Sequence, residues 1–250
     1  MSAQPHVLSQ SDLDRDGFAV IRGLVDDVTL RRMQRGFDRL YAIGRGLQRS
    51  TTVHNTRFVI RPEPFALERA VWCSGAAPEL QLGHHAPTLD LVCDVLGTEA
   101  PVQIIQQAHF KMPGDGVTFR WHQDASNRRY GSHQWNDVDG RGSFLQIAVA
   151  VDPIGADNGG LSFLPGTHRL GFVADPVTGA LPPESVDEST ALTPELEPGD
   201  AVIFGPFVIH GSAANQSGTS RRTFLQGFAC PGANAHTYPG CGTGVTRIRR

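Results

Sequence analysis

Hydrophobic residues recur at helical spacing in the first hundred residues of the chain. The clearest case begins at Asp26–Asp27 and continues to about Tyr41, where Leu30, Met33, Phe37 and Leu40 lie three or four positions apart. We predict a short capped helix over 11–16, a strand over 17–22 and a helical pattern over 78–96 that stops at Gly97. Residues 44–64 are polar and irregular, which is typical of a flexible segment near a pocket mouth.

From residue 101 the pattern changes to short apolar or alternating runs separated by Gly-, Pro-, Asn- and Asp-rich turns. The predicted strands cover 101–110, 117–124, 143–151, 161–164, 201–204, 207–211 and 222–229. With the N-terminal strand this gives about eight strands, the number that a double-sheet jelly roll uses. Residues 173–192, rich in Pro, Glu and Ser, are predicted to form a surface insertion.

We therefore expect a mostly β fold, a cupin-like jelly roll (double-stranded β-helix) with flanking α-helices. Residues 1–250 show no internal repeat and no linker, so they are predicted to form a single domain. In this division an N-terminal flank occupies about 1–100, the jelly-roll core about 101–230, and an irregular tail 231–250.

Composition narrows the class of protein. A hydrophobic content of 40% and a charged content of 19% fit an ordinary soluble globular protein. The net charge of −3 gives no reason to expect nucleic acid or an anionic membrane as a partner. The N-terminus lacks a secretion-signal pattern, no apolar run approaches the ~20 residues of a membrane span, and the four cysteines show no CxxC pairing. These features favour a cytoplasmic protein with reduced thiols; the sequence does not predict its oligomeric state.

A metal site is the strongest chemical signal in the sequence. Residues two apart on a strand point the same way, so His122 and Asp124 are predicted to present an imidazole and a carboxylate to one side. His210 is the best candidate for a third ligand, and two histidines with one carboxylate are typical of non-haem Fe(II) oxygenases. On residue type alone, further candidate ligands are His54, His84, His85, His133 and His168.

Several motifs occur in an order that resembles a known family. They are Lys111-Met112-Pro113-Gly114, Trp121-His122-Gln123-Asp124, Asn158-Gly159-Gly160-Leu161, Leu164-Pro165-Gly166-Thr167-His168, and His210-Gly211-Ser212 followed by Arg221. Together they are similar to the phytanoyl-CoA hydroxylase family of Fe(II)/2-oxoglutarate dioxygenases. The resemblance extends from Asp16-Gly17 to about Ala229.

The resemblance implies a ligand set and a co-substrate site. Iron would be held by His122, Asp124 and His210, with 2-oxoglutarate and O2 as co-substrates. Arg221 stands where the family places the arginine that binds the far carboxylate of 2-oxoglutarate, a role that suits a guanidinium.

Four other residues are expected near the co-substrate. Gln107, His109 and Lys111 share one face of the strand that precedes the metal motif, and relatives often use a polar residue at the position of His109 to contact 2-oxoglutarate. A fourth iron ligand from His109 is disfavoured, because it would close a position that catalysis requires. Trp135 is expected either to pack on the co-substrate or to close the pocket.

The reaction and the substrate are less defined. In related halogenases a chloride replaces the carboxylate ligand, so Asp124 favours hydroxylation of an unactivated C–H bond, with succinate and CO2 as co-products. Arg128 and Arg129 fit two interpretations: they recognise a carboxylate of an amino-acid-like substrate or secondary metabolite, or they are solvated loop charges. Gln146 lies on a strand face whose small residues leave room beside iron. The alternatives are a desaturase, cyclase or halogenase on the same iron site, or a non-catalytic cupin-like metal-binding protein.

Overall fold

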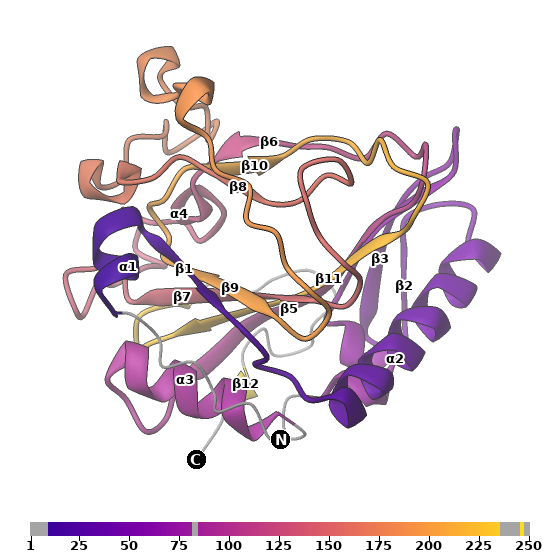
Figure 1. Ribbon diagram of the computed structural model, residues 1–250. Helices are drawn as coiled ribbons and strands as arrows, with labels where there is room; N and C mark the ends of the chain where they lie inside the picture. The colour runs from indigo at the N-terminus through magenta and orange to yellow at the C-terminus, as the bar shows by residue number, and fades with distance from the viewer. Residues whose placement is uncertain (1–9, 82–84, 236–245, 248–250) are drawn as a thin grey trace.

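The computed structural model describes residues 10–81, 85–235 and 246–247 (Figure 1). Within them the strands form two antiparallel sheets, one of nine strands and one of three. The large sheet has the order β1-β9-β7-β11-β5-β4-β3-β2, with β12 paired to β5, and the small sheet has the order β6-β10-β8. The mostly antiparallel jelly roll predicted from the sequence is confirmed.

The strands are β1 (Phe18–Ile21), β2 (Thr51–Val53), β3 (Thr56–Arg61), β4 (Ala66–Val71), β5 (Val102–Lys111), β6 (Phe119–His122), β7 (Phe144–Ala150), β8 (Ser162–Phe163), β9 (Ala201–Phe204), β10 (His210–Ser212), β11 (Arg221–Ala229) and β12 (Thr246–Arg247). The α-helices are α1 (Gln10–Asp16), α2 (Asp27–Gly46), α3 (Ala86–Leu96) and α4 (Asp124–Asn127). Short 3-10 turns are η1 (Cys73–Gly75), η2 (Pro78–Leu80), η4 (Thr167–Leu170), η5 (Pro183–Ser185) and η6 (Glu188–Thr190).

Helices α2 and α3 cover one face of the large sheet (Figure 1). Helix α2 begins after Asp26, whose carboxylate accepts a hydrogen bond from Thr29 N at 2.7 Å. Its buried stripe includes Phe37, whose ring lies 5.2 Å from that of Phe110 on β5 and 6.5 Å from that of Phe224 on β11. Burial of this stripe against the sheet stabilises the helix and anchors the strands that carry the site.

The opposite face of the large sheet packs against the small sheet. Phe163 of β8 stacks on Phe18 of β1 with ring centroids 4.4 Å apart and also contacts Phe204 of β9 at 5.2 Å. These rings belong to a second buried cluster that joins the two sheets. The space between the sheets is therefore packed by apolar side chains near β8 and β9.

The prediction that residues 44–64 are irregular is wrong. After α2 the chain forms β2 and β3, and with β4 they extend the large sheet beyond β5. The run Thr56–Arg61 alternates strictly, with Phe58 and Ile60 buried in the core and Arg57 and Val59 on the other face. The run looks polar because that second face lines a cavity and not the core.

Smaller differences concern element boundaries. The helical pattern over 78–96 divides into η2 and α3, because Pro87 is placed in the first turn of a new helix, and Gly97 ends it at φ +63°. Strand β6 ends at His122, and Asp124 begins α4 in place of continuing the strand. The tail from residue 231 is not wholly irregular, since β12 pairs with β5, whereas residues 236–245 and 248–250 lie outside the described residues.

Among the described helices none is long and apolar enough to cross a membrane. Cys73, Cys93 and Cys230 are buried, and burial raises the pKa of the Cys73 and Cys230 thiols. Cys241, the remaining cysteine, lies outside the described residues.

Replacing Phe37 with Ala should lower the free energy of unfolding by about 3–5 kcal/mol, because it leaves a cavity between α2 and two strands of the large sheet. Denaturant unfolding followed by circular dichroism measures this change. The matched control is Val28→Ala on the exposed side of the same helix, where the side chain is 64% exposed and the expected change is below about 0.5 kcal/mol. Equal losses for the two variants would contradict the assignment of Phe37 to the core.

Candidate active site

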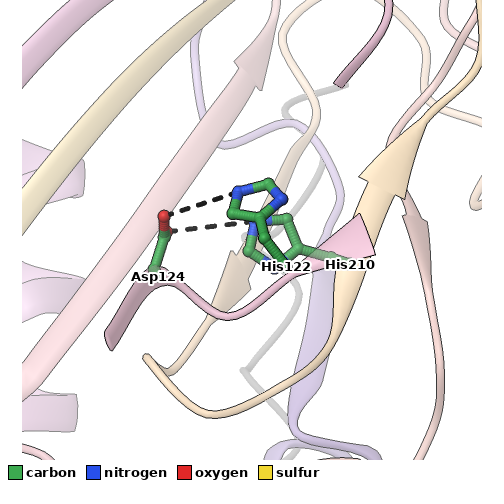
Figure 2. Close-up of side chains that lie close together, drawn as sticks. All are labelled: His122, Asp124 and His210. Atoms are coloured by element: carbon green, nitrogen blue, oxygen red, sulfur yellow. Dashed lines mark ion pairs between the residues drawn. The ribbon is translucent and has the colours of Figure 1, made fainter. Parts of the chain in front are cut away.

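Pairing between the edge strand β6 and the central strand β10 of the small sheet brings two histidines together. His122 is the last residue of β6 and His210 the first of β10, and they are direct partners in the antiparallel register. Their ring centroids lie 4.3 Å apart. Asp124, at the start of α4, turns its carboxylate toward both rings (Figure 2).

The spacing of the three side chains suits a shared metal ion. His122 Nε2 lies 3.8 Å from Asp124 Oδ1, and His210 Nε2 lies 4.0 Å from Asp124 Oδ2. These separations are too long for hydrogen bonds, yet they are within twice a metal–ligand distance of about 2.1 Å. Among the described residues this is the one group of three or more His, Cys, Asp or Glu side chains whose ligand atoms converge in this way.

Hydrogen bonds from the far side of each ring fix the orientation of the histidines. His122 Nδ1 lies 2.8 Å from the carbonyl of Arg120, and His210 Nδ1 lies 3.0 Å from the carbonyl of Val208. A carbonyl can only accept, so each Nδ1 carries the proton and each Nε2 directs a lone pair toward Asp124. Burial lowers the pKa of His210 to about 4, which keeps this imidazole neutral and able to bind a metal at neutral pH.

Asp124 is a buried carboxylate without a full set of partners. Its Oδ2 is buried and accepts no hydrogen bond from the part of the chain that the structure describes. Burial alone would raise the pKa of Asp124, but the positive charge of Arg128, with smaller contributions from the neighbouring histidines and a hydrogen bond from Asn127, outweighs it and holds the pKa below its ordinary value. A buried anionic oxygen that faces two imidazole lone pairs fits a divalent cation. The cation supplies a positive charge to which all three groups can donate electron pairs.

Arg221 is a buried cation that lines the same cavity as the three candidate ligands His122, Asp124 and His210. Its guanidinium donates to the carbonyl of Gly159 through Nε, at 3.0 Å, and Nη2, and to Thr223 Oγ1 through Nη1 at 3.0 Å. No Asp or Glu oxygen lies within 4.0 Å of it in residues 10–81 and 85–235. Burial lowers the pKa of Arg221 to about 10, although the more distant charges of Asp115 and Asp152 act to raise it, so the group stays charged at neutral pH.

The cavity has a volume of about 710 Å³ and contains most of the residues that the sequence singled out. Besides the three ligands and Arg221, the predicted site residues that line it are Gln107, His109, Arg128, Arg129 and Gln146. His109 contacts the Gln107 side chain, and burial together with the charges of Arg69 and Arg221 lowers its pKa well below the ordinary value. Arg128 donates to Gln146 Oε1 at 2.9 Å.

Two predicted site residues lie outside the cavity lining. The Lys111 amino group is directed to the end of β10, where it donates to Ser212 Oγ at 2.7 Å and to the carbonyls of Ser212 and Ala213; burial and the charge of Arg221 lower its pKa to about 6. Trp135 packs against Phe144 and Tyr130 at ring distances of 6.2 and 6.4 Å. Both side chains therefore support neighbouring elements in this structure.

Several cavity residues were not anticipated. Arg57 and Arg69 line it from β3 and β4, Ser212 from β10 and Thr223 from β11. The alternation of the run Thr56–Arg61 was the available signal for Arg57, since it places Arg57 on the strand face opposite the buried Phe58 and Ile60; no such signal marked Arg69. Ser212 follows His210 by two positions on a strand, so it shares the face of a metal ligand.

Comparisons with known proteins agree with this geometry. The family model described as phytanoyl-CoA dioxygenase matches residues 13–223. The phytanoyl-CoA dioxygenase domain-containing protein 1 of Danio rerio is 28% identical over 150 residues, covering 56% of this chain and 49% of the relative. The ectoine dioxygenase of Nocardia farcinica is 27% identical over 238 residues, covering 84% and 73%. The chain spans about half the length of the first of these relatives.

Solved structures share the fold. EvdO2 from Micromonospora carbonacea var. aurantiaca, in a complex with 2-oxoglutarate, superposes with a TM-score of 0.69 at 23% identity, covering 96% of this chain and 98% of that one. EctD from S. alaskensis in its apoform gives a TM-score of 0.71 at 19% identity, covering 97% and 83%. At these identities the structures establish the architecture. The family model covers most of the chain, and the protein belongs to the phytanoyl-CoA dioxygenase family.

Proposed function

We propose that this protein is an Fe(II)- and 2-oxoglutarate-dependent dioxygenase that hydroxylates an unactivated C–H bond of a small molecule, with succinate and CO2 as co-products. The observation that carries the proposal is the convergence of His122, Asp124 and His210 on one point of a cavity that Arg221 also lines. The iron ligands and the anchor for an anionic co-substrate thus meet in one place.

The donor set fits ferrous iron. Two imidazoles and one carboxylate hold a divalent ion and leave its other positions open, which an oxygenase needs for its co-substrates. A ferrous ion in this site would supply O2 activation coupled to the conversion of 2-oxoglutarate to succinate and CO2. The protein contributes the fixed orientation of the rings, through the carbonyls of Arg120 and Val208, and burial of Asp124.

Arg221 is suited to bind the far carboxylate of 2-oxoglutarate. A guanidinium offers paired N–H donors that match a carboxylate, and Arg221 is held in place by Gly159 and Thr223 without an acidic partner. The Thr223 hydroxyl lines the cavity beside it, and so does Ser212. The 2-oxoglutarate complex of EvdO2 supports the same co-substrate for this fold.

The substrate is expected to be small, amino-acid-like or a secondary metabolite. Curated relatives include the Nocardia ectoine dioxygenase, an L-proline trans-4-hydroxylase of Streptomyces griseoviridis and a methylphosphonate hydroxylase of Gimesia maris. Arg128, Arg129 and Gln146 line the cavity beside the metal site and are proposed as substrate contacts. Asp124 supports hydroxylation over halogenation, because it occupies the position that a halide would need.

A non-catalytic metal-binding protein is the weaker alternative. A scaffold without turnover gains nothing from a buried guanidinium that has no acidic partner, since desolvating that charge is costly. The buried guanidinium of Arg221, with no carboxylate in contact among the described residues, therefore supports an enzyme that binds an anion here.

Replacing Arg221 with Met should raise the KM for 2-oxoglutarate roughly 30-fold or more, because truncating one partner of a buried charge pair costs about 2–5 kcal/mol. Succinate release at varied 2-oxoglutarate measures the change. Arg31→Met, on the exposed side of α2, is the matched control and should leave KM unchanged. An Arg221 variant with the KM of the unaltered protein would remove this arginine from the co-substrate site.

Replacing Asp124 with Ala should abolish succinate formation and weaken metal binding, because it removes the single anionic ligand. Binding is measured by titrating the metal-free protein with Co(II) and following the visible absorption. Glu184→Ala, at an exposed position, serves as the control. Circular dichroism should give matching spectra for both variants, and Co(II) binding of unchanged strength in the Asp124 variant would contradict the ligand assignment.

A further inference from the structure

The cavity carries more positive charge than the metal and co-substrate require. Arginines from five elements or their flanking residues line it, and Asp124 is the single carboxylate that lines it among the described residues. The arginines are Arg57, Arg69, Arg120, Arg128, Arg129 and Arg221. Ferrous iron and doubly charged 2-oxoglutarate cancel each other, so a strong positive excess remains after both have bound.

Arg57 and Arg69 are neighbouring members of this set whose side chains the proposed function does not use. They come from β3 and β4, where Arg57 is the register partner of Val71 and Val59 is the partner of Arg69. Each arginine is thus the diagonal neighbour of the other on one face of the sheet, a relation that places Cβ atoms about 7–8 Å apart. At this spacing two long side chains can reach the same anion.

Neither guanidinium has a strong acidic partner. No Asp or Glu oxygen lies within 4.0 Å of Arg57 in the described part of the chain, and Arg69 has Glu68, its neighbour in sequence, at 3.9 Å. Burial lowers the pKa of Arg69, and its guanidinium lies over the ring of Phe119 at 5.7 Å. Two like charges on diagonal positions of one sheet face repel each other, and an anion between them would relieve that repulsion.

The two arginines of this pair project from strands that are not adjacent to the strand of Arg221. Arg69 is the register partner of His109 on β5, and His109 is the partner of Thr223 on β11, so two strand spacings separate β4 from the strand of Arg221. Two spacings amount to about 10 Å. A cavity of about 710 Å³ lies within the range of sites that bind whole small-molecule ligands, so it has room for a second molecule beside 2-oxoglutarate.

We propose that Arg57 and Arg69 form a second anion site that binds a carboxylate or a phosphorus oxyanion at the end of the substrate remote from the oxidised carbon. The substrate class is therefore an anionic small molecule. The identification of the bound anion as the substrate rests on the proposed function. The anion site itself is a property of the sheet face and can be tested without turnover.

The binding test uses radiolabelled malonate and inorganic phosphate in equilibrium dialysis, with and without Mn(II) and 2-oxoglutarate. The double variant Arg57→Gln/Arg69→Gln should weaken binding of at least one probe about 10- to 100-fold, as expected for loss of hydrogen bonds to charged groups. The double variant Arg57→Lys/Arg69→Lys should retain part of the binding, and Arg31→Gln should retain all of it. The preferred probe distinguishes a carboxylate from a phosphorus oxyanion. Binding of both probes by the glutamine variant as tightly as by the unaltered protein would overturn the proposal.

The turnover test compares pairs of compounds as stimulators of 2-oxoglutarate consumption, each acid against its neutral amide or ester. The acids should stimulate at concentrations about 10- to 100-fold lower than their neutral partners, and the glutamine double variant should remove that preference. Neutral members that stimulate as well as the acids would contradict the inference. In the glutamine double variant, a rise in the KM for 2-oxoglutarate that exceeds the rise in the half-saturating concentration of the acid would also contradict the inference. Such a result would mean that Arg57 and Arg69 bind the co-substrate. Absence of any succinate would count against the proposed function, while the dialysis result would still decide the anion site.

Discussion

The antiparallel pairing of β6 with β10 is the constraint on which the site depends. It sets His122 directly opposite His210, and the carbonyls of Arg120 and Val208 then fix which nitrogen of each ring faces the cavity. Asp124 completes the group because the chain leaves the strand at His122 and turns into α4. A shift of this register by one residue would direct one imidazole to the other face of the small sheet, and no shared metal site would remain.

The site contains buried charged groups that are only partly satisfied by the described residues. Asp124 Oδ2 accepts no hydrogen bond, and the Arg221 guanidinium has no carboxylate in contact. Such groups destabilise a fold, and the rest of the molecule offsets the cost through the packing of α2 and α3 on the large sheet. On the other side of the strand from Arg221, Arg222 donates to Asp152 at 2.8 Å and to Asp38 of α2 at 2.7 Å. One arginine of β11 thus anchors the sheet to a helix, and its neighbour is left for a ligand.

Sequence reasoning succeeded where local pattern and chemistry agree. The strands β5, β7, β9 and β11, the helix α2 and the family were predicted, because apolar periodicity and closely spaced motifs carry that information. It failed for β2–β4, since a strand such as Thr56–Arg61 that faces a cavity shows polar residues where a core strand would show apolar ones. The direction of the Lys111 side chain depends on Ser212, about a hundred positions away, and no local pattern encodes such a contact. For the same reason, local sequence did not predict that Arg57 and Arg69 line the cavity together, because this depends on the pairing of β3 with β4.

The central claim is that one cavity holds ferrous iron and 2-oxoglutarate together. The most direct test is an anaerobic titration of the metal-free protein with Fe(II) and 2-oxoglutarate, followed by visible absorption spectroscopy. The account predicts a charge-transfer band, as chelation of ferrous iron by 2-oxoglutarate gives, that saturates at one iron and one 2-oxoglutarate per chain. A protein that gives no band when both are present in excess would contradict it.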